Sequence, residues 1–174
     1  ALDCAQTAIV SGALFALAMP RGEGKTTISR CVVIWAVLHG YKRFPYLVGA
    51  TDEKGEEALQ VIQAELETNP LLLEDFPEVC WPLAQLEGIH NRAKGQLLNG
   101  RQTRITFGKR TLVLPTVPGS AASGAILKAG GLLSSLRGAQ HRLASGDILR
   151  PDLVIADDPQ TRESAESPPQ SATR

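Results

Sequence analysis

The stretch from Met19 to Thr26, which reads Met-Pro-Arg-Gly-Glu-Gly-Lys-Thr, constrains the fold of this chain more than any other feature. It lies between a short apolar run, 13–18, and a long apolar pattern that begins at Thr27. Glycines let backbone N–H groups curl around phosphate oxygens, a lysine supplies a point charge, and a following hydroxyl can ligate Mg²⁺. The order of strand, glycine-rich turn, Gly-Lys-Thr and helix therefore predicts a phosphate-binding loop of a nucleotide site.

One position of this loop departs from the common pattern G-x-x-x-x-G-K-[ST], because Met19 stands where the first glycine is expected. Gly22, Gly24 and Lys25 supply the phosphate-binding part of the pattern. Thr26 is the candidate Mg²⁺ ligand, and it can also act as the N-cap of the following helix. In the alternative interpretation, Lys25 is a surface lysine after a glycine turn.

Basic and acidic residues are equal in number over the whole chain, but they are concentrated in different segments. Eighteen basic residues offset eighteen acidic ones, so no overall field attracts nucleic acid. The segment 52–78 is almost entirely acidic in its charges, whereas 92–150 carries ten basic residues against the single acid Asp147. This asymmetry is compatible with a basic face that meets a polyanion, and equally with an ordinary solvated surface.

The cysteines and the lengths of the apolar runs limit which redox setting and which relation to a membrane the sequence favours. Cys4, Cys31 and Cys80 are far apart and lack paired histidines, so the sequence indicates neither a disulfide framework nor a zinc site and favours a reducing, intracellular setting. The longest apolar runs fall well short of the roughly 18 residues that span a membrane. No secretion signal opens the chain, and we expect a fragment truncated at both ends.

Hydrophobic periodicity predicts alternating strands and helices. We expect helices over 1–10, 27–38 and 52–68, buried strands over 13–18, 46–50 and 152–156, and a hairpin over 104–114. The stretch 118–138 contains five glycines and four serines and is interpreted as a mobile loop. This order predicts an α/β fold: a P-loop NTPase three-layer sandwich with a mainly parallel central sheet, formed by 1–174 as one domain.

An aspartate pair closes the third expected strand. Asp157 follows four apolar residues, so it can hold a Mg²⁺-bound water at the end of a buried strand. Asp158 can then orient and polarise an attacking water. Because ligands of open α/β sheets sit at the carboxyl ends of strands, the pair and the loop are expected to converge. In the alternative interpretation, Asp-Asp-Pro is only a capped turn.

Other polar residues have two interpretations each. Arg21 lies inside the loop and can neutralise charge on the γ-phosphate in the transition state, or it is simply exposed. Arg137 is a candidate sensor or finger for a neighbouring subunit, or a surface residue. Gln6 can contact adenine, although an ordinary exposed helical glutamine explains it equally.

These motifs together resemble the large, ATPase subunit of tailed-bacteriophage terminases, the motor that packages viral DNA. The resemblance covers nearly the whole chain and is carried by the loop 20–27, the acidic helix after the second strand, and the segments 69–77, 135–138 and 150–160. Motors of this family also replace the first loop glycine and place an arginine in the loop. The resemblance implies an N-terminal ATPase domain without the downstream nuclease domain.

Carried over by position, the resemblance implies a site for ATP and Mg²⁺. The nucleotide-binding residues would be Arg21, Gly22, Glu23, Gly24, Lys25, Thr26 and Thr27. The metal-side residues would be Thr26 and Asp157, and the catalytic residues Asp158 and Arg21. Implied partners are double-stranded DNA, the portal protein, the small terminase subunit and further copies of the chain in a ring, in the cytoplasm of the host bacterium and with no membrane.

The leading hypothesis is thus an ATP-hydrolysing motor domain that drives double-stranded DNA into a prohead. Two alternatives stay open. One is a helicase-like P-loop ATPase that acts on other nucleic acid. The other is a nucleotide-binding or subunit-docking module without turnover.

Overall fold

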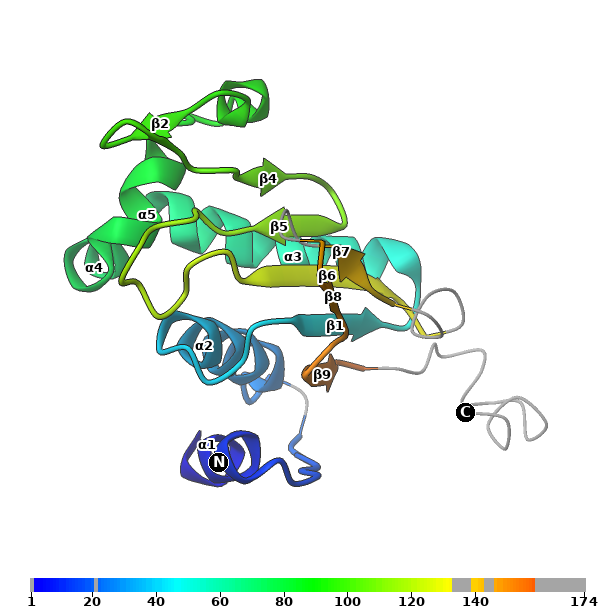
Figure 1. The fold of residues 1–174 in the computed structure, drawn as a ribbon. Coiled ribbons are helices and arrows are strands. Elements are labelled where there is room, and N and C mark those ends of the chain that lie inside the picture. The colour runs from blue at the N-terminus through cyan, green and yellow to red at the C-terminus, as the bar shows by residue number, and fades with distance from the viewer. Residues whose placement is uncertain (1, 21, 133–138, 143–145, 159–174) are drawn as a thin grey trace.

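A five-stranded sheet forms the centre of the computed structural model, which describes residues 2–20, 22–132, 139–142 and 146–158 (Figure 1). The strand order across the sheet is β4-β5-β6-β1-β9. The bounds of these strands are Thr106–Phe107 for β4, Thr111–Val113 for β5, Ile126–Gly131 for β6, Pro45–Gly49 for β1 and Leu153–Ala156 for β9.

The sheet is mixed in direction. β1 pairs in parallel with β6 on one side and with β9 on the other, whereas β5 is antiparallel to both β4 and β6. All five residues of β1 are buried, as expected for a strand flanked on both sides and covered on both faces. The α/β class is confirmed, and the parallel pairing expected for most of the sheet is confined to β6, β1 and β9.

Helices cover one face of this sheet. They are α2 (Lys25–Leu38), α3 (Asp52–Thr68), α4 (Pro70–Asp75) and α5 (Pro77–Ala84). Val33 of α2 and Leu59 and Ile62 of α3 are buried in the same cluster as Leu47 of β1 and Leu127 of β6. The apolar stripe predicted for the acidic helix is confirmed, because its apolar side meets the sheet while its charged side remains in water.

The opposite face is covered differently from the expected three-layer sandwich. Phe44, Tyr46, Val48 and Ile126 form a buried cluster there, and Leu149 packs against it. Leu149 belongs to β8 (Ile148–Leu149), which pairs with β7 (His141–Arg142) in a short hairpin (Figure 1). Within the described ranges, this hairpin takes the place of a second helical layer.

The predicted first helix is confirmed as α1 (Leu2–Ser11), and it packs against α2 through Ala5 and Ile9. Gly12 ends it in the left-handed region, with φ of 72°. The N–H of Gly12 bonds to the carbonyl of Ile9 and the N–H of Ala13 to that of Ala8, the pattern of a Schellman cap.

The apolar run 13–18, expected as a central buried strand, forms no strand and is largely exposed. Leu14 is fully exposed, and Phe15 is 44% exposed. Its neighbour in space is β9, whose burial alternates along the strand because, among the described residues, β9 lies at the edge of the sheet and pairs with β1 alone. Two adjoining cavities of about 380 Å³ each separate the run from β9, so no backbone ladder joins them.

The glycine-rich stretch 118–138, expected as a mobile loop, contains β6, a strand in the middle of the sheet. Its pairing is fixed by distant residues: Leu47 lies opposite Ala129 and Val48 opposite Gly130. Residues 133–138 lie outside the described residues. The predicted hairpin 104–114 is confirmed as β4 and β5, with Phe107 opposite Leu112.

Glycines allow α3 to approach the sheet closely. A Cβ atom on Gly55 of α3 would lie 2.7 Å from the carbonyl oxygen of Gly130, and one on Gly49 would lie 2.6 Å from the N atom of Gly55. Both separations are too short for a side-chain carbon. The first turn of α3 therefore lies directly against the carboxyl ends of β1 and β6.

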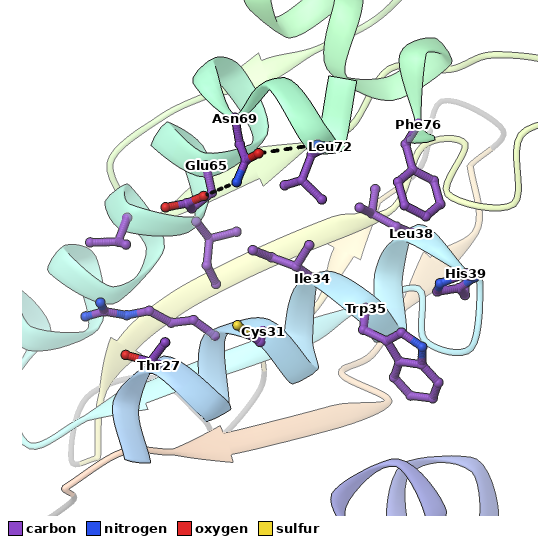
Figure 2. Close-up of a pocket in the computed structure, with 13 residues that line it drawn as sticks. Thr27, Cys31, Ile34, Trp35, Leu38, His39, Glu65, Asn69, Leu72 and Phe76 are labelled. Atoms are coloured by element: carbon purple, nitrogen blue, oxygen red, sulfur yellow. Dashed lines mark hydrogen bonds between the residues drawn. The ribbon is translucent and has the colours of Figure 1, made fainter. Parts of the chain in front are cut away.

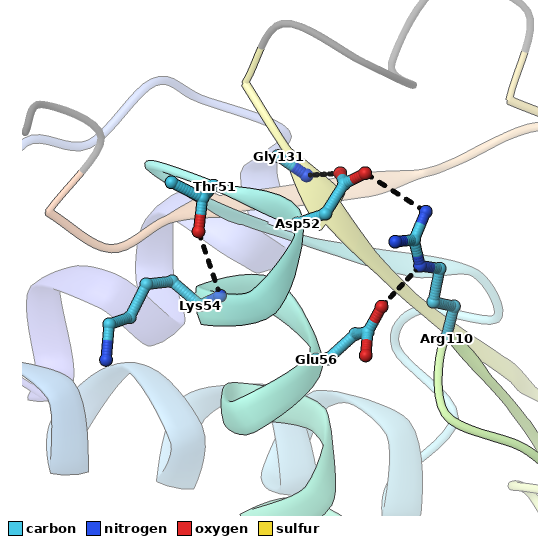
Figure 3. Close-up of polar contacts among 6 residues, drawn as sticks. All are labelled: Thr51, Asp52, Lys54, Glu56, Arg110 and Gly131. Atoms are coloured by element: carbon cyan, nitrogen blue, oxygen red, sulfur yellow. Dashed lines mark hydrogen bonds and ion pairs between the residues drawn. The ribbon is translucent and has the colours of Figure 1, made fainter.

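Polar contacts hold the same corner (Figure 3). Thr51 caps α3 by accepting a hydrogen bond from the N–H of Lys54. The Asp52 carboxylate accepts from the N–H of Gly131 at 2.6 Å and pairs with Arg110 at 3.1 Å. Arg110 also bonds to Glu56 at 2.5 Å, so the β4–β5 turn, α3 and the end of β6 are joined.

A second carboxylate fixes the start of β9. Asp152 accepts hydrogen bonds from the N–H groups of Arg43, at 2.7 Å, and Phe44, at 2.8 Å. The N–H of Asp152 in turn donates to the carbonyl of Phe44. These bonds align β9 with β1, and the register places Asp157 beyond the end of the ladder.

The remaining elements lie beyond α5. They are a 3₁₀ turn over His90–Ala93, β2 (Leu97–Leu98) and β3 (Arg101–Gln102), which pair as a small separate hairpin. The prolines at 77 and 82 both belong to α5. Pro77 opens α5 at a position where a missing N–H is harmless, and Pro82 lies within the same helix.

Candidate functional site

The loop before α2 has the backbone that its sequence predicts. Gly22 and Gly24 have φ values of 84° and 79°, in the left-handed region that residues with a Cβ rarely adopt. No heavy atom lies within 4 Å of a Cβ built on either glycine. The glycines are therefore required by the backbone conformation, and the space beside them is open to a ligand.

The N-terminus of α2 provides backbone donors at this loop. Gly24 is the N-cap of the helix, and no side chain caps the N–H groups of the first turn. A helix N-terminus combines such N–H groups with a positive dipole end and attracts anions. The expected alternative role of Thr26 as N-cap is wrong, because Gly24 occupies that position.

Lys25 folds back over the loop. Its ammonium group donates a hydrogen bond of 2.8 Å to the carbonyl oxygen of Met19. Met19 thus contributes its backbone carbonyl at the position where the common pattern has glycine. The loop is closed around the space that a phosphate would enter.

Lys25 and the aspartate pair line one cavity of about 380 Å³. Lys25 and Ser29 enter it from α2, and Asp157 and Asp158 enter it from the end of β9. The N–H of Asp157 bonds to the carbonyl of Val48, which extends the alignment of β9 along β1. Asp157 is half-buried, whereas Asp158 is exposed in a turn with φ of 41°.

The position of the aspartates differs in one respect from the expectation. They follow an edge strand and not a strand buried on both sides. Their placement at the carboxyl end of the sheet, near the glycine loop, agrees with the expectation for open α/β sheets. A cation and two carboxylates therefore surround a common space.

Other predicted residues are not brought to this cavity. Thr26 is half-buried in the first turn of α2 and is not among the described residues that line it. Thr27 lines a separate groove on the other side of α2, and Glu23 is exposed. Arg21 and Arg137 lie outside the described residues.

Ser29 is the polar residue that sequence reasoning missed. It lies four residues after Lys25, so the two side chains share one side of α2. Its hydroxyl adds a donor and acceptor to the cavity. Its helical spacing from Lys25 shows that the two residues share a side of α2, but the sequence does not show that this side meets the cavity.

The side chains that line this cavity are of the types that bind Mg²⁺ and a nucleotide's phosphates. Mg²⁺ is usually held by one or two carboxylates together with phosphate oxygens and water, which Asp157 and Asp158 can supply in part. Within the part of the chain that the structure describes, no group of three or more His, Cys, Asp and Glu side chains could hold an ion without such help.

Comparisons of the chain with models of protein families, with curated proteins and with solved structures found no match. None of the helices in the described ranges is long and apolar enough to cross a membrane.

Proposed function

We propose that this chain binds and hydrolyses ATP with Mg²⁺. The observation that carries the proposal is that Lys25, beside the uncapped N-terminus of α2, lines the same cavity as Asp157 and Asp158. A lysine with helix N–H groups on one side and carboxylates on the other matches the two needs of phosphoryl transfer, which are anion binding and positioning of a water.

Each residue has a defined part in this proposal. The N–H groups of Gly24 to Thr26 bind phosphate oxygens, and Lys25 exchanges its bond to Met19 for the β- and γ-phosphates. Asp157 orients water on the metal side, and Asp158 accepts a proton from the attacking water. Mg²⁺, held in part through Asp157, would neutralise phosphate charge.

We further propose that the hydrolysis drives double-stranded DNA as the motor of a viral packaging terminase. Support comes from the resemblance of the loop 20–27 and the segment 150–160 to that family. In this proposal Arg21 contacts the γ-phosphate, and the portal protein, the small subunit and further copies of the chain are partners. The host cytoplasm is the corresponding compartment.

The test of the site is ATP turnover by the chain and by its Lys25→Ala variant, with Lys94→Ala as matched control because Lys94 is exposed on a loop distant in sequence. Loss of the phosphate-binding cation should lower turnover by about 100-fold or more. Equal turnover by the wild type and Lys25→Ala would refute the site. Stimulation of turnover by duplex DNA but not by single strands would support the motor.

A second candidate function is nucleotide binding without turnover. Two observations favour it: the run 13–18 that leads into the loop is not anchored in the sheet, and Asp158 is exposed. This candidate would be supported over the ATPase by two results together. The wild type should bind ATP tightly and lose that binding in Lys25→Ala, and neither the wild type nor Asp158→Glu should hydrolyse ATP.

A further inference from the structure

A second cavity lies on the other side of α2, between α2, α3 and α4 (Figure 2). Its volume is about 460 Å³, within the range of about 300 to 1,000 Å³ that is usual for small-molecule sites. Cys31, Ile34 and Leu38 of α2 share one side of the helix, at spacings of three and four residues, and face Ile62 and Leu72. We call this cavity the α2–α4 groove.

The α2–α4 groove is separate from the phosphate cavity. Lys25, Ser29 and Val32 line the phosphate cavity, whereas Thr27, Cys31 and Ile34 line the groove. Because these two sets are offset by two residues along α2, they lie on different sides of the helix. A ligand in the groove would not contact the aspartate pair.

One polar group in the groove lacks a partner. The Nε atom of Arg30 is buried, and no described atom accepts a hydrogen bond from it. None of the ion pairs within the described ranges includes Arg30. A guanidinium that lines an apolar groove without a carboxylate partner is poorly compensated, so an anionic acceptor that reaches its outer N–H groups would be stabilising there.

The carboxylate of Glu65, which also lines the groove, is directed elsewhere. It accepts a hydrogen bond of 2.8 Å from the side-chain amide of Asn69, whose oxygen in turn caps α4 (Figure 2). Glu65 is thus engaged in the junction between α3 and α4. It leaves the guanidinium of Arg30 unpaired among the described side chains.

The opposite end of the groove is aromatic. The ring of Phe76 meets that of His39 edge to face, with centroids 5.3 Å apart. The ring of Trp35 stacks on Tyr41 at 4.7 Å, which fixes the indole at the rim. An apolar, preferably aromatic, group would replace water along this wall, since aromatic side chains favour offset or edge contacts with another ring.

We propose that the α2–α4 groove binds a small organic carboxylate with an apolar, aryl-bearing body. The carboxylate pairs with the outer N–H groups of the Arg30 guanidinium, the body lies over Ile34 and Leu72, and the ring reaches Phe76. Charge complementarity at Arg30 and the apolar lining select this ligand class. The site is independent of the proposed nucleotide site.

The test uses 4-phenylbutyrate and its uncharged analogue 4-phenylbutanol as probes, with affinity measured by calorimetry on the full 174-residue chain. Phenylbutyrate should bind more tightly than the alcohol. Arg30→Gln should weaken phenylbutyrate binding by about tenfold or more, as expected for loss of a charged hydrogen bond, and leave the alcohol unchanged. The matched control Arg101→Gln removes an exposed arginine of β3 and should change neither.

Alkylation of Cys31 gives a second measurement that requires no variant. Cys31 lines the groove and is exposed, and Cys4 is an exposed cysteine outside it. Saturating phenylbutyrate should slow the reaction of Cys31 with iodoacetamide severalfold, read by mass spectrometry of the peptides, and leave Cys4 unchanged. Lys25→Ala should preserve this protection, since the phosphate cavity is a different site.

Four results would overturn the proposal. One is equal affinity of phenylbutyrate and phenylbutanol for the wild type. Another is unchanged phenylbutyrate affinity in Arg30→Gln, and the third is equal protection of Cys31 and Cys4. Loss of binding in Lys25→Ala would instead assign the probe to the phosphate loop, which also contradicts the proposal.

Discussion

The ammonium group of Lys25 lies 2.8 Å from the carbonyl oxygen of Met19 and donates a hydrogen bond to it. The two ends of the glycine loop are therefore joined by the side chain that we expect to bind phosphate. Without a phosphate, this bond gives the lysine an acceptor inside the loop. The unusual residue at position 19 is compatible with this arrangement, because only its backbone is used.

Replacement of Gly24 should lower both ATP affinity and stability, whereas replacement of a glycine outside the loop should lower stability alone. An alanine at φ of 79° costs about 1 kcal/mol, so Gly24→Ala should lower the free energy of unfolding by about that amount and also weaken ATP binding. Gly95 has the same φ of 79° and open surroundings but lies away from the loop. Gly95→Ala should lower stability similarly and leave ATP affinity unchanged, as measured by denaturation and equilibrium binding.

Gly55→Ala should destabilise the protein, although the same change in a helix interior usually stabilises by about 1 kcal/mol. The reason is the 2.7 Å separation between the new Cβ atom and the Gly130 carbonyl, an overpacking that costs about 1–3 kcal/mol. Gln60→Ala, at an exposed position of the same helix, should be nearly neutral. A higher midpoint of urea denaturation for Gly55→Ala would contradict the close packing of α3 on β6.

Sequence reasoning failed where the role of a residue depends on distant parts of the chain, as it does for the glycines that α3 packs against. Glycine and serine between 118 and 138 indicate a loop, yet Gly130 and Gly131 belong to β6 because α3 requires room there. The run 13–18 has the composition of a buried strand but no ladder partner. Helices such as α3 could be predicted because their apolar repeat lies within their own sequence. Strand pairing could not, because it depends on residues distant along the chain.

The candidate site was predictable to a similar degree. The order of Gly24, Lys25 and the aspartate pair was sufficient to expect a common location at the carboxyl end of the sheet. Sequence could not show that Thr27 faces the α2–α4 groove and Ser29 the phosphate cavity, because that division depends on how α2 is rotated about its axis.

The three cysteines should differ sharply in reactivity. Burial, together with the nearby charge of Glu78, raises the pKa of the Cys80 thiol to about 11, so almost none is thiolate at pH 8. Cys4 and Cys31 are exposed. A chromogenic disulfide reagent should therefore titrate two thiols quickly at pH 8 and the third only in denaturant. Rapid titration of all three in native protein would show that α5 is not packed as described.

Removal of the Asp152 carboxylate should release the start of β9 from β1. Asp152→Ala loses the acceptor for the N–H groups of Arg43 and Phe44, and we expect a loss of about 1–2 kcal/mol in the free energy of unfolding. Asp75→Ala removes an exposed carboxylate at the end of α4 and serves as control. Equal unfolding midpoints for the two variants would argue against the Asp152 bonds.

The bonds of Asp152 also determine when the protein can fold during its synthesis. They join the side-chain carboxylate of Asp152 to backbone N–H groups 108 and 109 residues earlier in the chain. At translation rates of about 5–20 residues per second, roughly 5 to 20 seconds pass between the synthesis of β1 and that of its partner β9. Throughout that interval a strand that is fully buried in the folded protein has an unpaired edge on the nascent chain, which is a site where aggregation can begin.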